Sequence, residues 1–128
     1  MDNAEARALE RAMVGLVGDY NEGYQFTAAD ISAIHKSWLG RIYEWAGEYR
    51  QVNVSKGDFP FAATNRAPSL MEEFERDVLV RHTPCNSKER ADIVRALADT
   101  HVALVLIHPF REGTGRVVRI LSTLMALQ

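Results

Sequence analysis

Residues 108–116 read His108-Pro109-Phe110-Arg111-Glu112-Gly113-Thr114-Gly115-Arg116, and Arg119 follows them. An apolar run, residues 102–107, precedes this segment, and apolar residues at helical spacing follow it over residues 117–127. We therefore expect a polar loop that joins two buried helices. Polar side chains held between buried helices indicate a binding or catalytic site.

The composition of this loop suits an anion. Gly113 and Gly115 can adopt positive φ and leave backbone N–H groups uncovered. A helix that begins near Arg116 adds unsatisfied N–H groups and its positive dipole end. Arg116 and Arg119 lie three residues apart, hence on one helix face, and guanidinium groups match phosphate oxygens well. The pattern predicts a polyphosphate ligand.

Two further residues could supply chemistry beside that phosphate. Glu112 is a hard oxygen ligand, and Mg²⁺ is usually held by one or two carboxylates together with substrate phosphates. His108 titrates near neutral pH and could accept a proton from an attacking hydroxyl. Taken singly, His108 could be a packed helix-end histidine, Glu112 a solvated acid, and the arginines a solvated helix face. Their combination at this spacing favours a functional site.

At these residues the chain resembles the Fic-domain signature His-Pro-Phe-x-x-Gly-Asn-Gly-Arg, with Thr114 in place of the asparagine. A second segment resembles the upstream block of the same family, Ile-His followed by Trp-Ala-Gly-Glu-x-Arg. Its matching residues are Ile34-His35, Leu39, Ile42-Tyr43 and Trp45-Ala46-Gly47-Glu48-Tyr49-Arg50. The similarity extends from about Gly23 to Leu127, and the chain is identified as a small single-domain Fic protein of the Fido superfamily, similar to the toxin-type adenylyltransferases.

The resemblance implies an all-α Fic fold, a compact helical bundle with a short β-hairpin flap beside the active-site loop. It implies a protein adenylyltransferase that moves AMP from ATP to a Ser, Thr or Tyr hydroxyl of a target protein. In that reaction His108 would be the base, and Glu112 would hold Mg²⁺ that bridges the α- and β-phosphates. The backbone of Gly113, Thr114 and Gly115 would bind phosphate oxygens. Arg116 and Arg119 would neutralise the leaving pyrophosphate.

Thr114 is the departure from the family signature. Asparagine both donates and accepts hydrogen bonds, whereas threonine is shorter, β-branched and poorly suited to positive φ. If the family's asparagine contacts phosphate through its side chain, we expect reduced rather than abolished activity. Two alternatives stay open: transfer of a different nucleotide, phosphocholine or phosphoryl group, or a Fic-like interaction module without activity.

Composition sets the wider limits. The 128 residues, 47% hydrophobic, suit one compact domain over residues 1–128. A net charge of −2 and the lack of a basic stripe argue against nucleic acid as a partner. Residues 102–107 are too short to span a membrane, and the single Cys85 suits a reducing compartment. We expect a cytoplasmic protein, unless a secretion system moves it.

Helical patterns dominate the remaining sequence. They predict a helix over residues 3–17, a capping box at Thr27 and Asp30, and a helix from there to Gly47. Further helices are expected behind Pro68 and from Asn86 onward. We expect His35, Trp38 and Trp45 to be packing residues, and Phe110 to anchor the loop in the core.

Residues 51–62 read instead as a short hairpin, with a turn at Lys56-Gly57-Asp58 and Pro60 at an edge. The resemblance implies that this flap docks a target protein by strand addition, although the hairpin could equally be a cover for the core.

Regulation and assembly complete the expectations. Many Fic proteins carry an inhibitory Ser/Thr-x-x-x-Glu-Gly/Asn helix, and the nearest matches here, Ser69 with Glu73 and the pair Glu22-Gly23, depart from it. We therefore expect restraint, if any, from a small antitoxin-like protein that acts on Arg119. Partly uncovered Leu121 and Leu124 would favour self-association.

Overall fold

The computed structural model describes residues 2–128. From the N-terminus the elements are α1 (Asn3–Asp19), α2 (Ala28–Leu39), the two-residue strands β1 (Ser55–Lys56) and β2 (Phe59–Pro60), the 3-10 turn η1 (Thr64–Arg66), α3 (Ala67–Phe74), the π-helical segment η2 (Glu75–Leu79), α4 (Val80–His82), α5 (Arg90–Ile107) and α6 (Thr114–Ala126). The fold is a helical bundle with one hairpin, as the sequence predicts.

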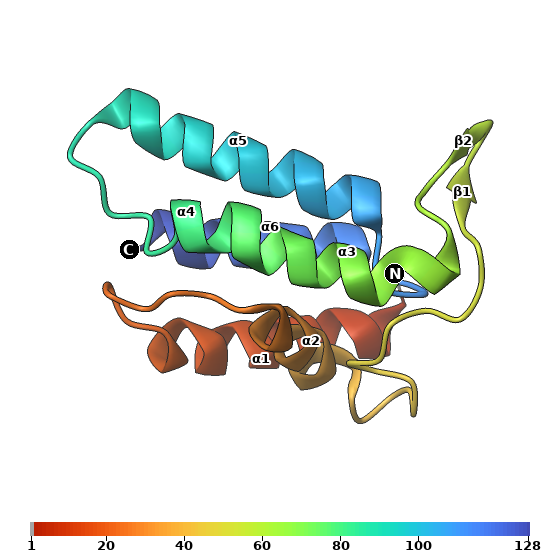
Figure 1. The fold of residues 1–128 in the computed structure, drawn as a ribbon. Helices are drawn as coiled ribbons and strands as arrows, with labels where there is room; N and C mark the ends of the chain where they lie inside the picture. Colours follow the sequence, from red (N-terminus) through yellow and green to blue (C-terminus); the bar gives the residue numbers. More distant parts are fainter. Residues whose placement is uncertain (1) are drawn as a thin grey trace.

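The helices stack in layers, with α5 on one side, α1 and α2 on the other, and α6 with the α3–α4 segment between them (Figure 1). The loop over residues 108–113 connects α5 to the antiparallel α6 at the end of the bundle where the hairpin also projects. The N-terminal end of α1 lies at this same end, whereas the turn that follows α1 lies at the opposite one. Two segments far from the polar loop in sequence, the hairpin and the start of α1, therefore lie at the same end of the bundle as the loop.

The central helix is α6, which contacts α5, α2 and α1. Its buried side chains are Thr114, Val117, Val118, Ile120, Leu121, Leu124 and Met125. Leu121 and Leu124 are only 1% and 3% exposed, because helices of the same chain cover them. The expectation that these two leucines are left partly uncovered is therefore wrong, and they lend no support to self-association, which stays an untested prediction.

The start of α2 follows the predicted capping box: the Thr27 side chain accepts from the Asp30 backbone N–H, and the Asp30 carboxylate accepts from that of Thr27. The predicted end at Gly47 is wrong, because α2 stops at Leu39 and residues 40–47 form successive turns. Gly47, with φ 85°, turns back on α2 and donates its N–H to Nδ1 of His35 over 2.8 Å. The chain beyond Leu39 thus folds back onto α2 instead of extending it.

Helix α3 follows Pro68 as predicted, whereas α5 begins later than predicted. Pro68 lies in the first turn of α3, where its missing N–H leaves no helical bond unmade. The rod continues through the π-helical η2 into α4, and Met71 and Phe74 pack into the core. Helix α5 begins at Arg90 rather than at Asn86, and its N-cap residue Glu89 makes no side-chain capping bond.

The hairpin forms within the expected residues, with Ser55 opposite Pro60 and Lys56 opposite Phe59. Gly57 takes φ 59° in the two-residue turn, a conformation that suits glycine. Both strands are exposed, and Phe59 is 53% exposed. A cross-strand bond of 3.0 Å from the Phe61 N–H to the Val54 carbonyl continues the pairing toward the base.

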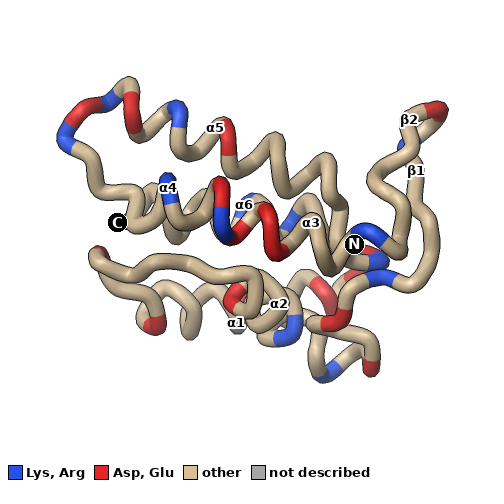
Figure 2. Tube along the Cα trace, viewed as in Figure 1, with Lys and Arg blue, Asp and Glu red and all other residues tan. Residues whose placement is uncertain are grey.

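Acidic and basic residues are interspersed along the helices, and both signs occur around the loop end of the bundle (Figure 2). Within residues 2–128 the structure holds no helix whose length and hydropathy would allow it to cross a bilayer.

Candidate active site

His108 occupies a strained position at the end of α5. It is the C-cap residue, with φ 50° and ψ 63°, and its N–H donates to the Leu104 carbonyl over 3.0 Å. Pro109 disfavours the right-handed helical region for the residue before it, which ends the helix here. Left-handed backbone at a non-glycine residue is uncommon and persists where the surroundings enforce it, typically at functional sites.

The His108 imidazole is stacked against the flap. Its ring lies 4.1 Å from the Phe61 ring at an interplanar angle of 9°. Nδ1 is buried and has no hydrogen-bond partner among the described residues. Burial, and secondarily the charge of Arg50, hold the pKa of His108 below its ordinary value. The imidazole is therefore neutral at neutral pH, the form that can accept a proton.

Arg50 is a buried residue to which the sequence assigned no role. The residue is 4% exposed, and its side chain donates to backbone carbonyls of two segments, the end of α5 and the flap. Nε donates to His108 over 2.6 Å, the two terminal nitrogens reach the flap carbonyls of Val52 and Ala62, and one of them also reaches Ile107. The signal that could have found Arg50 is its place as the last residue of the Trp45–Arg50 block.

His35 connects the two sequence blocks that carry the family resemblance. Because Nδ1 accepts from Gly47, the ring proton lies on Nε2, which donates to the Glu112 carbonyl over 2.9 Å. The ring is fully buried and stacks on Phe110 at 4.0 Å and 2°. Phe110 thus anchors the loop in the core, as predicted, and His35 fixes the backbone of Glu112.

Gly113 forms the turn into α6. It has φ 86°, and a Cβ at this position would lie 2.5 Å from Cζ3 of Trp38, so no larger residue fits. Helix α6 starts at Thr114, and the N–H groups of its first turn have no intrahelical acceptor. The expectation of positive φ at Gly115 is wrong, because Gly115 is helical. Gly115 and Arg116 are exposed, and no side chain caps this helix N-terminus, so its first N–H groups have no capping partner among the described residues.

Thr114 differs from its expected position. Its side chain is 2% exposed, and Oγ1 accepts the Phe110 N–H over 3.3 Å inside the loop. The structure therefore contradicts a phosphate contact by this side chain. The strain that positive φ would impose on a β-branched residue does not arise, because Thr114 is helical. Only the backbone N–H of Thr114, in the first turn of α6, stays a candidate for binding phosphate.

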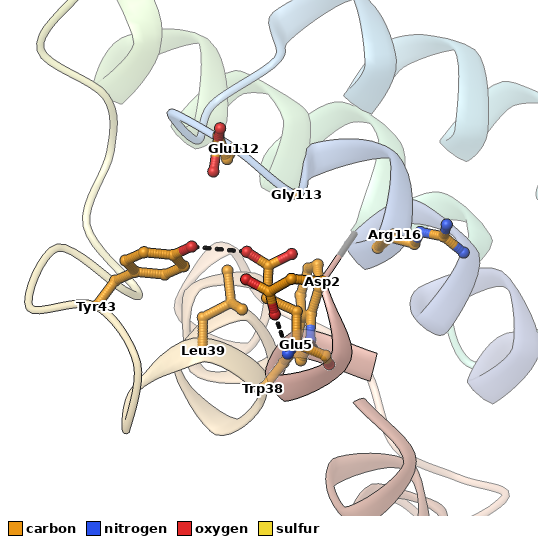
Figure 3. A pocket seen from close by; sticks show the side chains of 8 residues that line it. All are labelled: Asp2, Glu5, Trp38, Leu39, Tyr43, Glu112, Gly113 and Arg116. Carbon is orange, nitrogen blue, oxygen red and sulfur yellow. Dashed lines mark hydrogen bonds between the residues drawn. The ribbon is translucent and has the colours of Figure 1, made fainter. Parts of the chain in front are cut away.

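The three charged residues predicted to bind the ligand are exposed, as a ligand site requires: Glu112 in the loop, and Arg116 and Arg119 on α6. Within residues 2–128 none of their side chains has a hydrogen-bond or ion-pair partner. Figure 3 shows Glu112 and Arg116 on either side of Gly113. They border an open pocket of about 470 Å³ between the loop, α1 and α2.

The opposite wall of this pocket is fixed by hydrogen bonds to Glu5 of α1. The Tyr43 hydroxyl donates to Oε1 of Glu5 over 2.7 Å, and the Trp38 indole donates to its carbonyl over 3.0 Å (Figure 3). Trp38 also contacts Gly113, so α1 supports the turn from behind.

These parts define a class: a helical domain whose loop combines a neutral histidine, an exposed carboxylate and a helix N-terminus without a capping side chain, suited to phosphate chemistry. Residues 25–126 match the family model of the Fic/DOC family. The chain belongs to that family, which confirms the interpretation of both sequence blocks.

The chain is also similar to proteins that are named as adenylyltransferases. The chain is 29% identical over 101 residues to "Probable protein adenylyltransferase Fic" of Escherichia coli, across 76% of this chain and 48% of that protein. It is 32% identical over 100 residues to "Protein adenylyltransferase VbhT" of Bartonella schoenbuchensis, across 74% and 20%. The chain thus spans half or less of the length of these relatives.

Solved structures show the same fold. The N-terminal Fic domain of an effector protein from Bartonella sp. AR 15-3 has a TM-score of 0.83 at 21% identity, covering 95% of this chain and 60% of that chain. The BepC protein of Bartonella tribocorum, solved with bound AMPPNP, has a TM-score of 0.76 at 23% identity, covering 95% and 64%.

Proposed function

We propose that this chain is a protein adenylyltransferase that transfers AMP from ATP to a Ser, Thr or Tyr hydroxyl of a target protein. The observation that carries the proposal is His108, a neutral imidazole held in left-handed backbone at the start of a loop that ends in a helix N-terminus without a capping side chain. The names of the relatives and the nucleotide bound to BepC support ATP as the donor.

The reaction follows from the placement of the groups. The neutral imidazole of His108 takes the proton of the target hydroxyl as its oxygen attacks the α-phosphorus. The bond from that phosphorus to the bridging oxygen breaks, and pyrophosphate leaves. Backbone N–H groups at the start of α6, with Arg116 and Arg119, stabilise the negative charge on the phosphate oxygens. Catalysis rests on positioning and electrostatics.

The residues also fit Mg²⁺. Glu112 offers an exposed carboxylate beside the first turn of α6, and it has no partner within residues 2–128. No group of three acidic, histidine or cysteine residues in that range could hold a metal alone. This donor set suits Mg²⁺ held jointly by one carboxylate and substrate phosphates, where the ion would offset phosphate charge.

The hairpin is placed to present the target. Its two strands are exposed, and within the described residues each has an unpaired outer edge. Phe61, where the hairpin joins the rest of the chain, stacks on His108. A segment paired with the flap would therefore lie close to the imidazole that acts as the general base. We assign residues 51–62 to docking of an extended target segment by strand addition.

Regulation by a second protein is part of the proposal. Arg119 is exposed on α6 and has no acidic partner within residues 2–128. An acidic side chain from an antitoxin-like protein could pair with it and occupy the space of the terminal phosphate. In this account the protein acts in the cytoplasm.

Labelled nucleotides test the proposal. The chain is incubated with cell lysate and ATP labelled at either the α- or the γ-phosphate, beside a His108→Ala variant. Kinases in the lysate also transfer the γ-phosphate, so label is counted above that of lysate without the chain. On this measure we expect protein-bound label from α-labelled ATP only, and none with His108→Ala. Label from the γ-phosphate would point to phosphoryl transfer instead, and label that persists in His108→Ala would remove the histidine from the reaction.

A further inference from the structure

We infer that Arg50 is a positioning residue that fixes the catalytic base and the target-docking flap relative to each other. The inference deepens the proposed function and rests on it, since it assigns the alignment of the two reactants to one buried side chain. Arg50 touches neither reactant itself and acts through the backbone of His108 and of the flap.

The first support is the set of contacts. The guanidinium binds carbonyls at the end of α5, on His108 and Ile107, and carbonyls on both arms of the flap, on Val52 and Ala62. A planar fork with five donors in fixed directions can bind two segments at once, which a lysine ammonium does less rigidly.

The backbone of Arg50 adds to the same connection. Its N–H donates to the Pro109 carbonyl over 2.8 Å, and its own carbonyl accepts from the Thr64 hydroxyl over 2.7 Å. Arg50 therefore binds the left-handed residue His108 and also the residues on either side of it, Ile107 and Pro109. The strained conformation of His108 has a partner that enforces it.

The second support is the absence of a carboxylate. Within residues 2–128 Arg50 forms no salt bridge, although it is 4% exposed. A buried charge is costly unless its donors are satisfied, and here carbonyls alone satisfy them. The retained positive charge faces the end of α5 and also lowers the pKa of His108. The same side chain thus affects both the geometry and the ionisation of the base.

Two substitutions separate these effects. Arg50→Lys keeps the charge and loses the fork, whereas Arg50→Met loses both. Arg95→Met is the matched control, because Arg95 is an exposed residue of α5 outside the site. The readouts are kcat and KM for ATP in AMP transfer, and the pKa of His108 by NMR titration of the imidazole.

We expect kcat to fall about tenfold or more in both Arg50 variants, because a small misalignment of the reacting groups lowers the rate strongly. KM for ATP should change less than about threefold, since Arg50 is not among the groups proposed to bind the phosphates, which are the first turn of α6, Arg116 and Arg119. The pKa of His108 should stay near its wild-type value in Arg50→Lys and rise toward about 6.5 in Arg50→Met. Arg95→Met should match the wild type in all three.

A wild-type kcat in Arg50→Lys would overturn the inference, and if Arg50→Met does not fold, Arg50→Lys decides alone. An unchanged pKa of His108 in folded Arg50→Met would also contradict it. If the wild-type chain transfers no AMP, the proposed function fails, but the NMR titration still reports whether Arg50 controls His108. The two failures are therefore distinguishable.

Discussion

The Trp38 ring fills the space that a side chain at Gly113 would need, since a Cβ there would lie 2.5 Å from Cζ3 of the indole. Gly113 also has φ 86°, which strains any L-residue. The indole is held in turn by its hydrogen bond to the Glu5 carbonyl of α1. The N-terminal turn of α6 is thus supported by two helices, α2 and α1, that belong to a different part of the sequence.

Gly113→Ala should therefore destabilise the protein by about 2 kcal/mol or more, from backbone strain together with overpacking. Urea unfolding monitored by circular dichroism measures this. Gly15→Ala is the matched control: Gly15 lies within α1 with nothing within 4 Å of its would-be Cβ, so alanine should stabilise by about 0.5–1 kcal/mol. Equal effects of the two substitutions would contradict the role of Trp38.

His35 should make stability depend on pH. Burial lowers its pKa, partly offset by the bond to Glu112, so the unfolded chain takes up a proton before the folded one does. The stabilisation is complete above about pH 6.5 and declines as pH falls below it. Comparing the free energy of unfolding at about pH 7.5 and about pH 5, we expect a smaller difference in His35→Gln than in the wild type.

A residual pH dependence should remain in His35→Gln, because burial and Arg50 lower the pKa of His108 in the same direction. An unchanged pH dependence in His35→Gln would show that the buried ring does not contribute.

Phe61 should control the ionisation of His108. Burial is the larger cause of the lowered pKa, and Phe61 covers the ring face at 4.1 Å. Phe61→Ala should raise the pKa of His108 toward about 6.5, so the activity should be lost at a higher pH than in the wild type as the pH falls. NMR titration measures the shift, and Phe59→Ala, which alters an exposed part of the flap, should leave this pKa unchanged.

Thr114 should affect stability more than catalysis. Thr114→Val removes the acceptor of a buried N–H on Phe110, at an expected cost of about 1–3 kcal/mol, whereas Thr114→Ser retains it. Thr114→Asn should alter the rate of AMP transfer less than about threefold, because this side chain faces the interior of the loop. A large gain in rate with Thr114→Asn would restore the view that threonine limits the reaction.

Local signals in the sequence predicted much of this structure. The Thr27–Asp30 capping box, the turn at Gly57 and the inward Phe110 each depend on a few neighbouring residues, and all three are confirmed. The loop between α5 and α6 followed from apolar periodicity on both sides of it.

The remaining features depend on contacts between distant segments. Beyond the end of α2, Gly47 folds back to donate to His35 within that helix, and the orientation of Thr114 goes with its bond to the Phe110 backbone. The sequence does not show what Arg50 binds, because its partners are backbone carbonyls, which every residue carries. Residue types alone do not reveal such partners.

The most direct test of the account is mass spectrometry of a protein modified by this chain in the presence of ATP and Mg²⁺. The account predicts the mass of one added AMP on a Ser, Thr or Tyr side chain, and no addition when His108→Ala replaces the wild type. Addition of a phosphoryl group alone, or an AMP adduct that forms equally with His108→Ala, would contradict it.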